Sequence, residues 1–341
     1  MILVTGGTGL VGAHLLAHLA QKNTPIRATH RASSDLDAVK EIFRIYGPEV
    51  EHLYSSIEWM EANIIEIPAL ERAFEGISEV YHCAAYISFN PKNFRALKKT
   101  NVEGTANLVN LSLAKGIKKF CHVSSIATLG TSVDGQPIDE ESFWNPEENH
   151  NVYSLTKHGA EMEVWRGVQE GLIAVIVNPG VILGEGFWNS GSGIIVKNAA
   201  KGSKFYTPGG SGFVDVRDVV TVMQLLMESH IASERYILVA QNLTYLQLLT
   251  KLAKAFENTP PTKELPRSMF NWLSRLDAFA SFFFGTKRKL LRAMVDAMYS
   301  VSTFNNEKVR SNLNFQFTPI EETIERVAKN YSSSSRAGDS N

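Results

Sequence analysis

A glycine-rich segment near the start of the chain constrains the fold more than any other feature. Residues Thr5–Gly12 (TGGTGLVG) directly follow a short apolar run, Ile2–Val4. A strand, a glycine turn and then a helix is the arrangement in which a dinucleotide pyrophosphate binds. Gly6 permits a tight turn, Gly9 lets the backbone approach phosphates, and Gly12 lets the helix pack on the strand. The free N–H groups of that helix would face the anion. A purely structural glycine loop is the alternative.

The composition predicts a globular protein with a large core. The chain has 341 residues, of which 44% are hydrophobic, and 34 basic and 35 acidic residues leave a net charge of -1. This balance gives no reason to expect nucleic acid or an anionic membrane as partner. Cys83 and Cys121 lie in apolar runs and indicate neither a disulfide scaffold nor a metal site. Because the first strand begins at Ile2 and no apolar run reaches the roughly 20 residues of a membrane span, we expect a cytoplasmic protein.

Strands and amphipathic helices alternate through the first half of the chain. This order predicts an α/β fold with a Rossmann-type doubly wound parallel sheet. The expected strands are Ile2–Thr5, Ile26–Arg31, Ile57–Ala62, Glu79–Cys83, Lys118–Ser124 and Ile173–Asn178. The expected helices are Leu10–Gln21, Asp35–Tyr46, Pro68–Phe74, Phe94–Lys115 and Val152–Gln169. Residues 1–178 would therefore form the dinucleotide-binding domain.

The regular alternation ends after residue 178. We expect residues 179–331 to form a smaller, mainly helical substrate-binding part. Segment 213–240 would return to the sheet, through a strand at 213–216, a helix from Arg217 and a strand at Arg235–Val239. Residues 332–341 are polar and of low complexity, which predicts a disordered tail.

Tyr153 and Lys157 lie four residues apart on an expected helix, so both side chains share one face. A phenol titrates near 10, and a nearby ammonium would lower its pKa toward the working range of an acid-base catalyst. An exposed tyrosine and lysine one helical turn apart is the alternative.

Ser124 and Ser125 lie at the end of the fifth expected strand, at the edge where ligands of open α/β sheets bind. A hydroxyl there can donate to a substrate carbonyl, although a Ser-Ser pair is also a common helix cap.

Asn101 interrupts an otherwise amphipathic helix and is soon followed by Gly104. Both are locally unfavourable there, which indicates a role in a site, with an exposed polar face as the alternative.

These motifs, in this order, resemble those of the extended short-chain dehydrogenase/reductases, the group of the NAD-dependent epimerase/dehydratases. The character is nearest to dihydroflavonol 4-reductase-like and 3β-hydroxysteroid dehydrogenase-like members. The resemblance covers nearly all of residues 1–331 and also rests on His82–Ala85, Asn178–Gly180 and Phe213–Asp218. It implies that Tyr153 donates or accepts the proton, that Lys157 binds the nicotinamide ribose, that Ser125 holds the carbonyl, and that Asn101 supports a water.

The same resemblance implies the set of residues that contact the cofactor. These are Gly6, Thr8, Gly9, Leu10, Val11, Gly12, Arg31, Asn63, Ala84, Tyr153, Lys157, Pro179 and Val181. The second strand ends at Arg31 and Ser33–Ser34 follow, with no acid before Asp35. An arginine and hydroxyls suit a 2′-phosphate, whereas NAD enzymes usually place a carboxylate there. We therefore predict NADP(H), with NAD(H) as the alternative if Arg31 is only a surface residue.

The predicted activity is hydride transfer between NADP(H) and a carbonyl or secondary alcohol of a small, apolar substrate. Dehydratases of the family carry an Asp-Glu pair after the serine, where this chain has Ile126–Thr128. An NAD-dependent nucleotide-sugar epimerase is the alternative, with Arg217 as a candidate to bind the diphosphate of the substrate. A non-catalytic cofactor-binding protein is a third possibility.

Apolar residues over Met269–Phe284 suggest a cover for the substrate or ordinary helix packing. The resemblance also implies a homodimer through helices 94–115 and 152–169.

Overall fold

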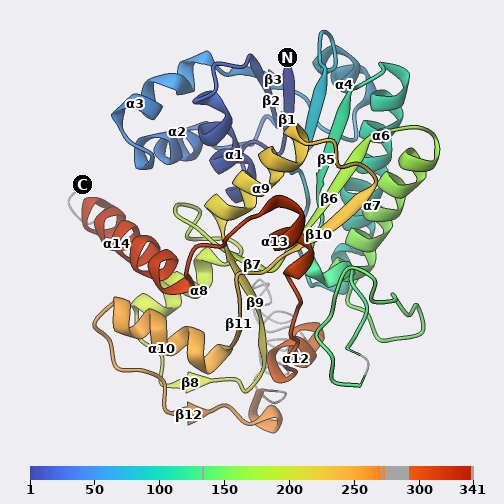
Figure 1. The fold of residues 1–341 in the computed structure, drawn as a ribbon. Coiled ribbons are helices and arrows are strands. Elements are labelled where there is room, and N and C mark those ends of the chain that lie inside the picture. The colour runs from blue at the N-terminus through green and yellow to red at the C-terminus, as the bar shows by residue number, and fades with distance from the viewer. Residues whose placement is uncertain (133, 271, 273–291, 339–341) are drawn as a thin grey trace.

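A seven-stranded parallel sheet forms the centre of the computed structural model, which describes residues 1–132, 134–270, 272 and 292–338 (Figure 1). The strand order is β10-β6-β5-β4-β1-β2-β3. This is the doubly wound order, and the predicted fold class is confirmed. The strands are β1 (Ile2–Thr5), β2 (Ile26–His30), β3 (Glu58–Glu61), β4 (Glu79–His82), β5 (Lys119–Val123), β6 (Ala174–Pro179) and β10 (Glu234–Leu238).

Helices cover both faces of this sheet, and a separate apolar cluster fills the space under each layer. Side chains of successive strand residues point to opposite faces, so Phe120 of β5 belongs to one cluster and Cys121 to the other. In Figure 1 the two helical layers lie on opposite sides of the strands. One layer contains α1 (Leu10–Ala20), α2 (Leu36–Ile45), the short α3 (Pro48–Glu51) and α9 (Val216–Glu228). The other contains α4 (Ile67–Ala73), α5 (Phe94–Leu97), α6 (Gly104–Ala114) and α7 (Val152–Gln169).

The helix expected over 94–115 is divided by a π-helical turn. Residues Lys98–Glu103 form this turn between α5 and α6, and Asn101 lies inside it. Turns of this kind are rare and occur frequently at functional sites.

The C-terminal part adds two small sheets to the expected helices. A three-stranded sheet has the order β11-β9-β7, and β8 pairs with β12. These strands are β7 (Val181–Leu183), β8 (Phe205–Tyr206), β9 (Gly210–Asp215), β11 (Gln241–Thr244) and β12 (Lys263–Glu264). The helices are α8 (Gly193–Ala200), α10 (Tyr245–Ala255), α12 (Arg292–Tyr299), α13 (Glu307–Leu313) and α14 (Ile320–Gly338).

Two expectations about this part need correction. Within segment 213–240, α9 and β10 return to the main body, but β9 pairs with β7 and β11 and not with the main sheet. The reason is that β7 follows β6 directly after Gly180 and offers its edge to β9. The tail expected to be disordered continues helix α14 as far as Gly338. Ser332 and Ser333 donate to the carbonyls four residues earlier, so the helix itself satisfies their hydroxyls.

No helix among the described residues is long and apolar enough to cross a bilayer. Most of the apolar segment Met269–Phe284 lies outside the described residues. Trp272 is described and has 59% of its surface exposed.

Candidate active site

The glycine-rich turn lies at the carboxyl end of β1. Gly6 has a left-handed backbone, with φ at +72°, and a Cβ on it would lie 2.5 Å from the Ala84 nitrogen. A Cβ on Gly12 would lie 2.1 Å from the Gly6 carbonyl oxygen, whereas one on Gly9 would meet that oxygen at 3.6 Å. Gly9 is exposed and caps α1 without a side chain. The first amides of α1 are therefore presented on an open glycine surface, which fits a pyrophosphate.

The segment after β2 carries the residues that would meet the adenosine ribose. Arg31 is exposed, and its backbone N–H donates to the Ser34 hydroxyl oxygen over 3.0 Å. The Thr8 hydroxyl of the glycine-rich turn also donates to Ser34, over 3.3 Å. The Asp35 carboxylate accepts from the Ala38 N–H and caps α2. The nearest acid is thus engaged at a helix end, while a cation and two hydroxyls line the turn.

The other predicted cofactor residues follow neighbouring strands at the same edge of the sheet. Asn63 is half-buried after β3, and the Ala62 N–H donates to the His30 carbonyl, which joins the ends of β2 and β3. Pro179 ends β6 and Val181 begins β7. Leu10 and Val11 are half-buried in the first turn of α1. Whether each of these touches a cofactor stays a prediction.

The structure brings Ser125, Tyr153 and Lys157 together at the carboxyl end of β5. Lys157 is only 2% exposed, and its ammonium donates to the Val123 carbonyl oxygen over 2.8 Å. The Ser125 side chain lies beside the Tyr153 hydroxyl and acts to lower the pKa of that phenol. The ring of Phe89 lies against Tyr153, with 5.4 Å between centroids.

Burial dominates the charge states of this pair. It raises the pKa of Tyr153, and the neighbouring Ser125 side chain offsets this effect only in part. Burial also lowers the pKa of Lys157 to about 8, against the opposing charge of Glu161. The expected lowering of the Tyr153 pKa by Lys157 is therefore wrong for this structure. The reason is that the phenol is desolvated and the ammonium is bonded to Val123.

Asn101 is fully buried and clamps the loop that follows β4. Its amide oxygen accepts from the Tyr86 N–H over 2.7 Å, and its amide nitrogen donates to the Tyr86 carbonyl over 3.0 Å. The same nitrogen lies 3.2 Å from the Thr156 hydroxyl oxygen on α7. Protein partners thus use both amide hydrogens, so the side chain positions the segment that carries Phe89. The expected support of a water stays a prediction.

A sequence model of the NAD-dependent epimerase/dehydratase family matches residues 2–239, which include every element of this site. The chain belongs to the NAD-dependent epimerase/dehydratase family. Sterol demethylase protein B of Methylococcus capsulatus is 30% identical over 276 residues, 80% of each chain. A provisionally named dihydroflavonol 4-reductase of Synechocystis sp. is 30% identical over 273 residues, 77% of this chain and 74% of the relative.

Solved structures of the epimerase/dehydratase fold cover almost the whole chain. The UDP-glucose 4-epimerase of Thermus thermophilus, solved in complex with NAD, superposes with a TM-score of 0.73 at 19% identity and covers 97% of this chain and 98% of its own. The motif-based assignment to the extended short-chain dehydrogenase/reductases is thereby confirmed. Enzymes of this family are oxidoreductases, epimerases and dehydratases that act on CH–OH and C=O groups with NAD(P).

In this family member the two adjacent serines have different surroundings. The Ser124 hydroxyl points into the protein and donates to Glu161 Oε2 over 2.6 Å. Ser125 is half-buried, and its hydroxyl oxygen accepts from the Ala127 N–H over 3.1 Å. Only Ser125 has its hydroxyl beside Tyr153, which agrees with the choice of Ser125 for the carbonyl.

Glu161 and Phe89 are members of the site that the motifs did not reveal. Glu161 lies four residues after Lys157, and that spacing on one helix face was an available signal. Phe89 has no local signal, because contacts such as the Asn101 clamp on Tyr86 place its loop near α7. Arg217, the candidate for a substrate diphosphate, instead forms an ion pair with the buried Glu185 and covers the Tyr46 ring.

Proposed function

We propose that the protein is an NADP(H)-dependent oxidoreductase that transfers hydride between the nicotinamide and a carbonyl or secondary alcohol of a small, apolar substrate. The proximity of the Ser125 and Tyr153 side chains, at the carboxyl edge of the sheet, carries this proposal. Two hydroxyls that lie side by side can both donate to one carbonyl oxygen. Preorganised donors at a developing oxyanion contribute about 3 kcal/mol each in comparable sites.

Tyr153 has the charge state that a proton donor needs. Because burial raises the pKa of its hydroxyl, the phenol is protonated at neutral pH. When bound, the dinucleotide supplies the hydride to the carbonyl carbon. In that direction Ser125 and Tyr153 hold the oxygen, and Tyr153 gives it the proton. The Lys157 ammonium lies one helical turn away and would bind the ribose hydroxyls.

The preference for NADP(H) is supported by the segment after β2. The exposed Arg31 guanidinium and the Ser34 and Thr8 hydroxyls suit a 2′-phosphate. The Asp35 carboxylate, which would repel that phosphate, is engaged with the N–H of Ala38.

The substrate is proposed to be apolar because of the loop after β4. Phe89 covers one side of the Tyr153 ring, and Tyr86 and Ile87 are 36% and 58% exposed. A ring or hydrocarbon chain can pack on this surface. The three residues after Ser125, Ile126–Thr128, provide no acid or base for a dehydration.

An exposed apolar strip supports a homodimer. Leu155 and Met162 lie seven residues apart on α7 and are 42% and 41% exposed, and Phe94 on α5 is 40% exposed. Residues seven apart lie on nearly the same helix face. We propose that helices α5, α6 and α7 of two copies pack through this strip.

Oxidation of NADPH and NADH by the purified protein, with a panel of aldehydes, ketones and ring-containing ketones, tests the function. We expect turnover with at least one carbonyl and a higher rate with NADPH. The variant Arg31→Ala should weaken NADPH binding by about 10- to 100-fold, the value of one charge-assisted hydrogen bond, with little effect on NADH. Arg44→Ala is the matched control, because Arg44 is an exposed cation that pairs with Glu41 and Glu51.

An unchanged NADPH to NADH ratio in Arg31→Ala would refute the cofactor assignment. No oxidation with any carbonyl, together with NAD that copurifies with the protein, would instead favour the nucleotide-sugar epimerase.

A further inference from the structure

A buried carboxylate on α7 collects hydrogen bonds from three other elements. Glu161 has no exposed side-chain surface. Its Oε2 accepts from the hydroxyls of Ser124 and Thr128, over 2.6 and 2.7 Å, and from the Asn178 amide over 3.0 Å. Its Oε1 lies 3.1 Å from an Arg235 guanidinium nitrogen. Every part of this carboxylate is therefore held by a donor.

The donors belong to the segment that presents Ser125. Ser124 precedes it, and Thr128 ends the single 3₁₀ turn that Ser125 begins. The Ser125 carbonyl oxygen accepts from the Thr128 N–H over 3.1 Å, and it lies 2.8 Å from the Thr128 hydroxyl oxygen and 3.1 Å from the Asn178 amide nitrogen. The two side chains that hold the Ser125 backbone are thus anchored on the same carboxylate oxygen. Glu161 sets the position of Ser125 without touching it.

The same carboxylate faces the catalytic lysine. Glu161 follows Lys157 by one helical turn, and its charge opposes the effect of burial on the ammonium. The other groups that face Lys157 are the Cys83 thiol and the imidazoles of His82 and His122. Burial raises the pKa of Cys83 to about 12 and lowers those of both histidines, to about 3 for His82. These three groups are neutral at pH 7, so Glu161 supplies the counter-charge.

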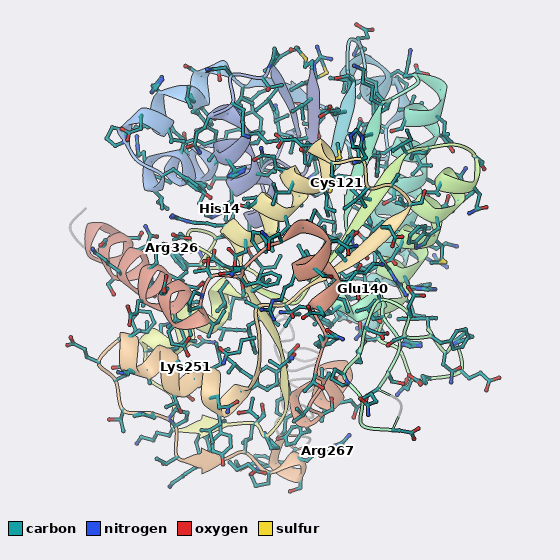
Figure 2. All side chains as sticks on the ribbon, viewed as in Figure 1. His14, Cys121, Glu140, Lys251, Arg267 and Arg326 are labelled. Atoms are coloured by element: carbon teal, nitrogen blue, oxygen red, sulfur yellow. The ribbon has the colours of Figure 1, made fainter. Side chains whose placement is uncertain are left out.

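The partners of Glu161 on its Arg235 side are themselves held in place and leave the carboxylate little freedom to move. The Arg235 guanidinium also donates to the backbone carbonyl oxygen of Glu140, over 2.7 Å from Nε, and the Glu140 carboxylate accepts from the N–H of Ile237 on β10. Figure 2 labels Glu140 beside this strand. A charge removed from water is costly unless it is paired and hydrogen-bonded. Here the pairing also joins α7 to strands β5, β6 and β10.

We propose that Glu161 is a positioning residue of the carbonyl chemistry, which keeps the Ser125 hydroxyl beside Tyr153 and provides the counter-charge of the Lys157 ammonium. This inference rests on the proposed function. It assigns two separable tasks to one side chain, an anchor for the segment 124–128 and a charge for Lys157.

Two substitutions separate these tasks. Glu161→Gln keeps the shape and removes the charge, so kcat should fall and the alkaline limb of its pH profile should move to lower pH. Glu161→Asp keeps the charge but draws it back from the three donors. It should lower kcat on the order of 100-fold, as small misplacements of reacting groups do, without moving that limb. In Glu161→Asp the Kd for NADPH, measured by fluorescence, should change by less than about twofold, because the charge near Lys157 is kept and no cofactor contact is altered.

Glu185→Gln is the matched control. Glu185 is equally buried and pairs with the arginines Arg217 and Arg326, but with no catalytic side chain. Loss of the Glu185 charge should lower the thermal stability and leave the pH profile of kcat per folded molecule unchanged. The inference is refuted if Glu161→Gln and Glu161→Asp behave like this control. In that case both variants would have the wild-type kcat per folded molecule and the wild-type alkaline limb of the pH profile.

Titration of Lys157 by NMR, in protein labelled with ¹⁵N-lysine, gives a readout that needs no turnover. We expect a lower Lys157 pKa in Glu161→Gln than in the wild type and in Glu161→Asp. If none of the carbonyls tested supports NADPH oxidation by the wild type, the proposed function fails. The titration still decides whether Glu161 provides the counter-charge of Lys157. An unchanged Lys157 pKa would overturn it.

Discussion

Substitution of single glycines in the turn after β1 should separate cofactor binding from stability. A Cβ on Gly9 meets the Gly6 oxygen at 3.6 Å, an ordinary van der Waals contact, and the φ of −102° suits any residue. Gly9→Ala should therefore change the free energy of unfolding by less than about 0.5 kcal/mol. The new methyl group would project from the exposed cap of α1, where we predict that the pyrophosphate binds. We expect dinucleotide affinity to fall at least tenfold, about 1.4 kcal/mol.

Gly12→Ala should show the opposite pattern. Its Cβ would lie 2.1 Å from the Gly6 oxygen and 2.8 Å from the Gly6 carbonyl carbon, both backbone atoms that cannot rotate away. Overpacking of this kind costs about 1–3 kcal/mol. Because Gly6 itself packs against the Ala84 backbone, the displacement would pass to the end of β4. The variant should unfold at lower urea concentration than the wild type even without cofactor.

Urea unfolding of the cofactor-free protein and fluorescence titration with NADPH measure the two effects separately. For Gly9→Ala we expect wild-type unfolding with weakened binding, and for Gly12→Ala reduced stability. If Gly9→Ala binds dinucleotide as tightly as the wild type, the glycine surface is not the pyrophosphate site. If Gly12→Ala is as stable as the wild type, the packing argument is wrong.

Two further predictions concern ionisable groups. Tyr153→Phe removes the proton donor but keeps the ring beside Phe89, so turnover should be lost while the Kd for NADPH stays within about twofold; retained turnover would exclude Tyr153 from the proposed role. His14, labelled in Figure 2, is buried on α1 with a ring nitrogen 3.2 Å from the Glu185 carbonyl oxygen, and burial lowers its pKa to about 4. Because the unfolded chain binds this proton from pH 6.5 downward, stability should fall by about 3 kcal/mol between pH 6.5 and 4. His14→Gln should reduce that slope in urea unfolding, and an equal slope would contradict the assignment.

Local rules allowed the sheet and part of the site to be predicted from the sequence. The alternation of apolar strands and amphipathic helices is a property of short segments, so six of the strands and the doubly wound fold class followed from it. The spacing of Tyr153 and Lys157 is likewise local, since residues four apart share a helix face. The Thr5–Gly12 turn could be predicted because positive φ and close backbone approach require glycine.

The remaining features depend on contacts between distant residues. Asn101 binds Tyr86 and Thr156, which lie 15 and 55 residues away, and this clamp directs Phe89 to Tyr153. Burial, which a sequence does not state, raises the pKa of Tyr153 where the neighbouring lysine had suggested a lower one.

Ser124 and Ser125 show most directly what each level determines. The sequence places two hydroxyls at the end of β5 and supports Ser125 only through family resemblance. The tertiary structure assigns their roles, because successive side chains of an extended segment point to opposite sides. Ser124 turns inward to Glu161, a donor and acceptor 37 residues apart that the packing of α7 against the turn after β5 brings together. Ser125 is thereby left at the carboxyl edge of the sheet, beside Tyr153.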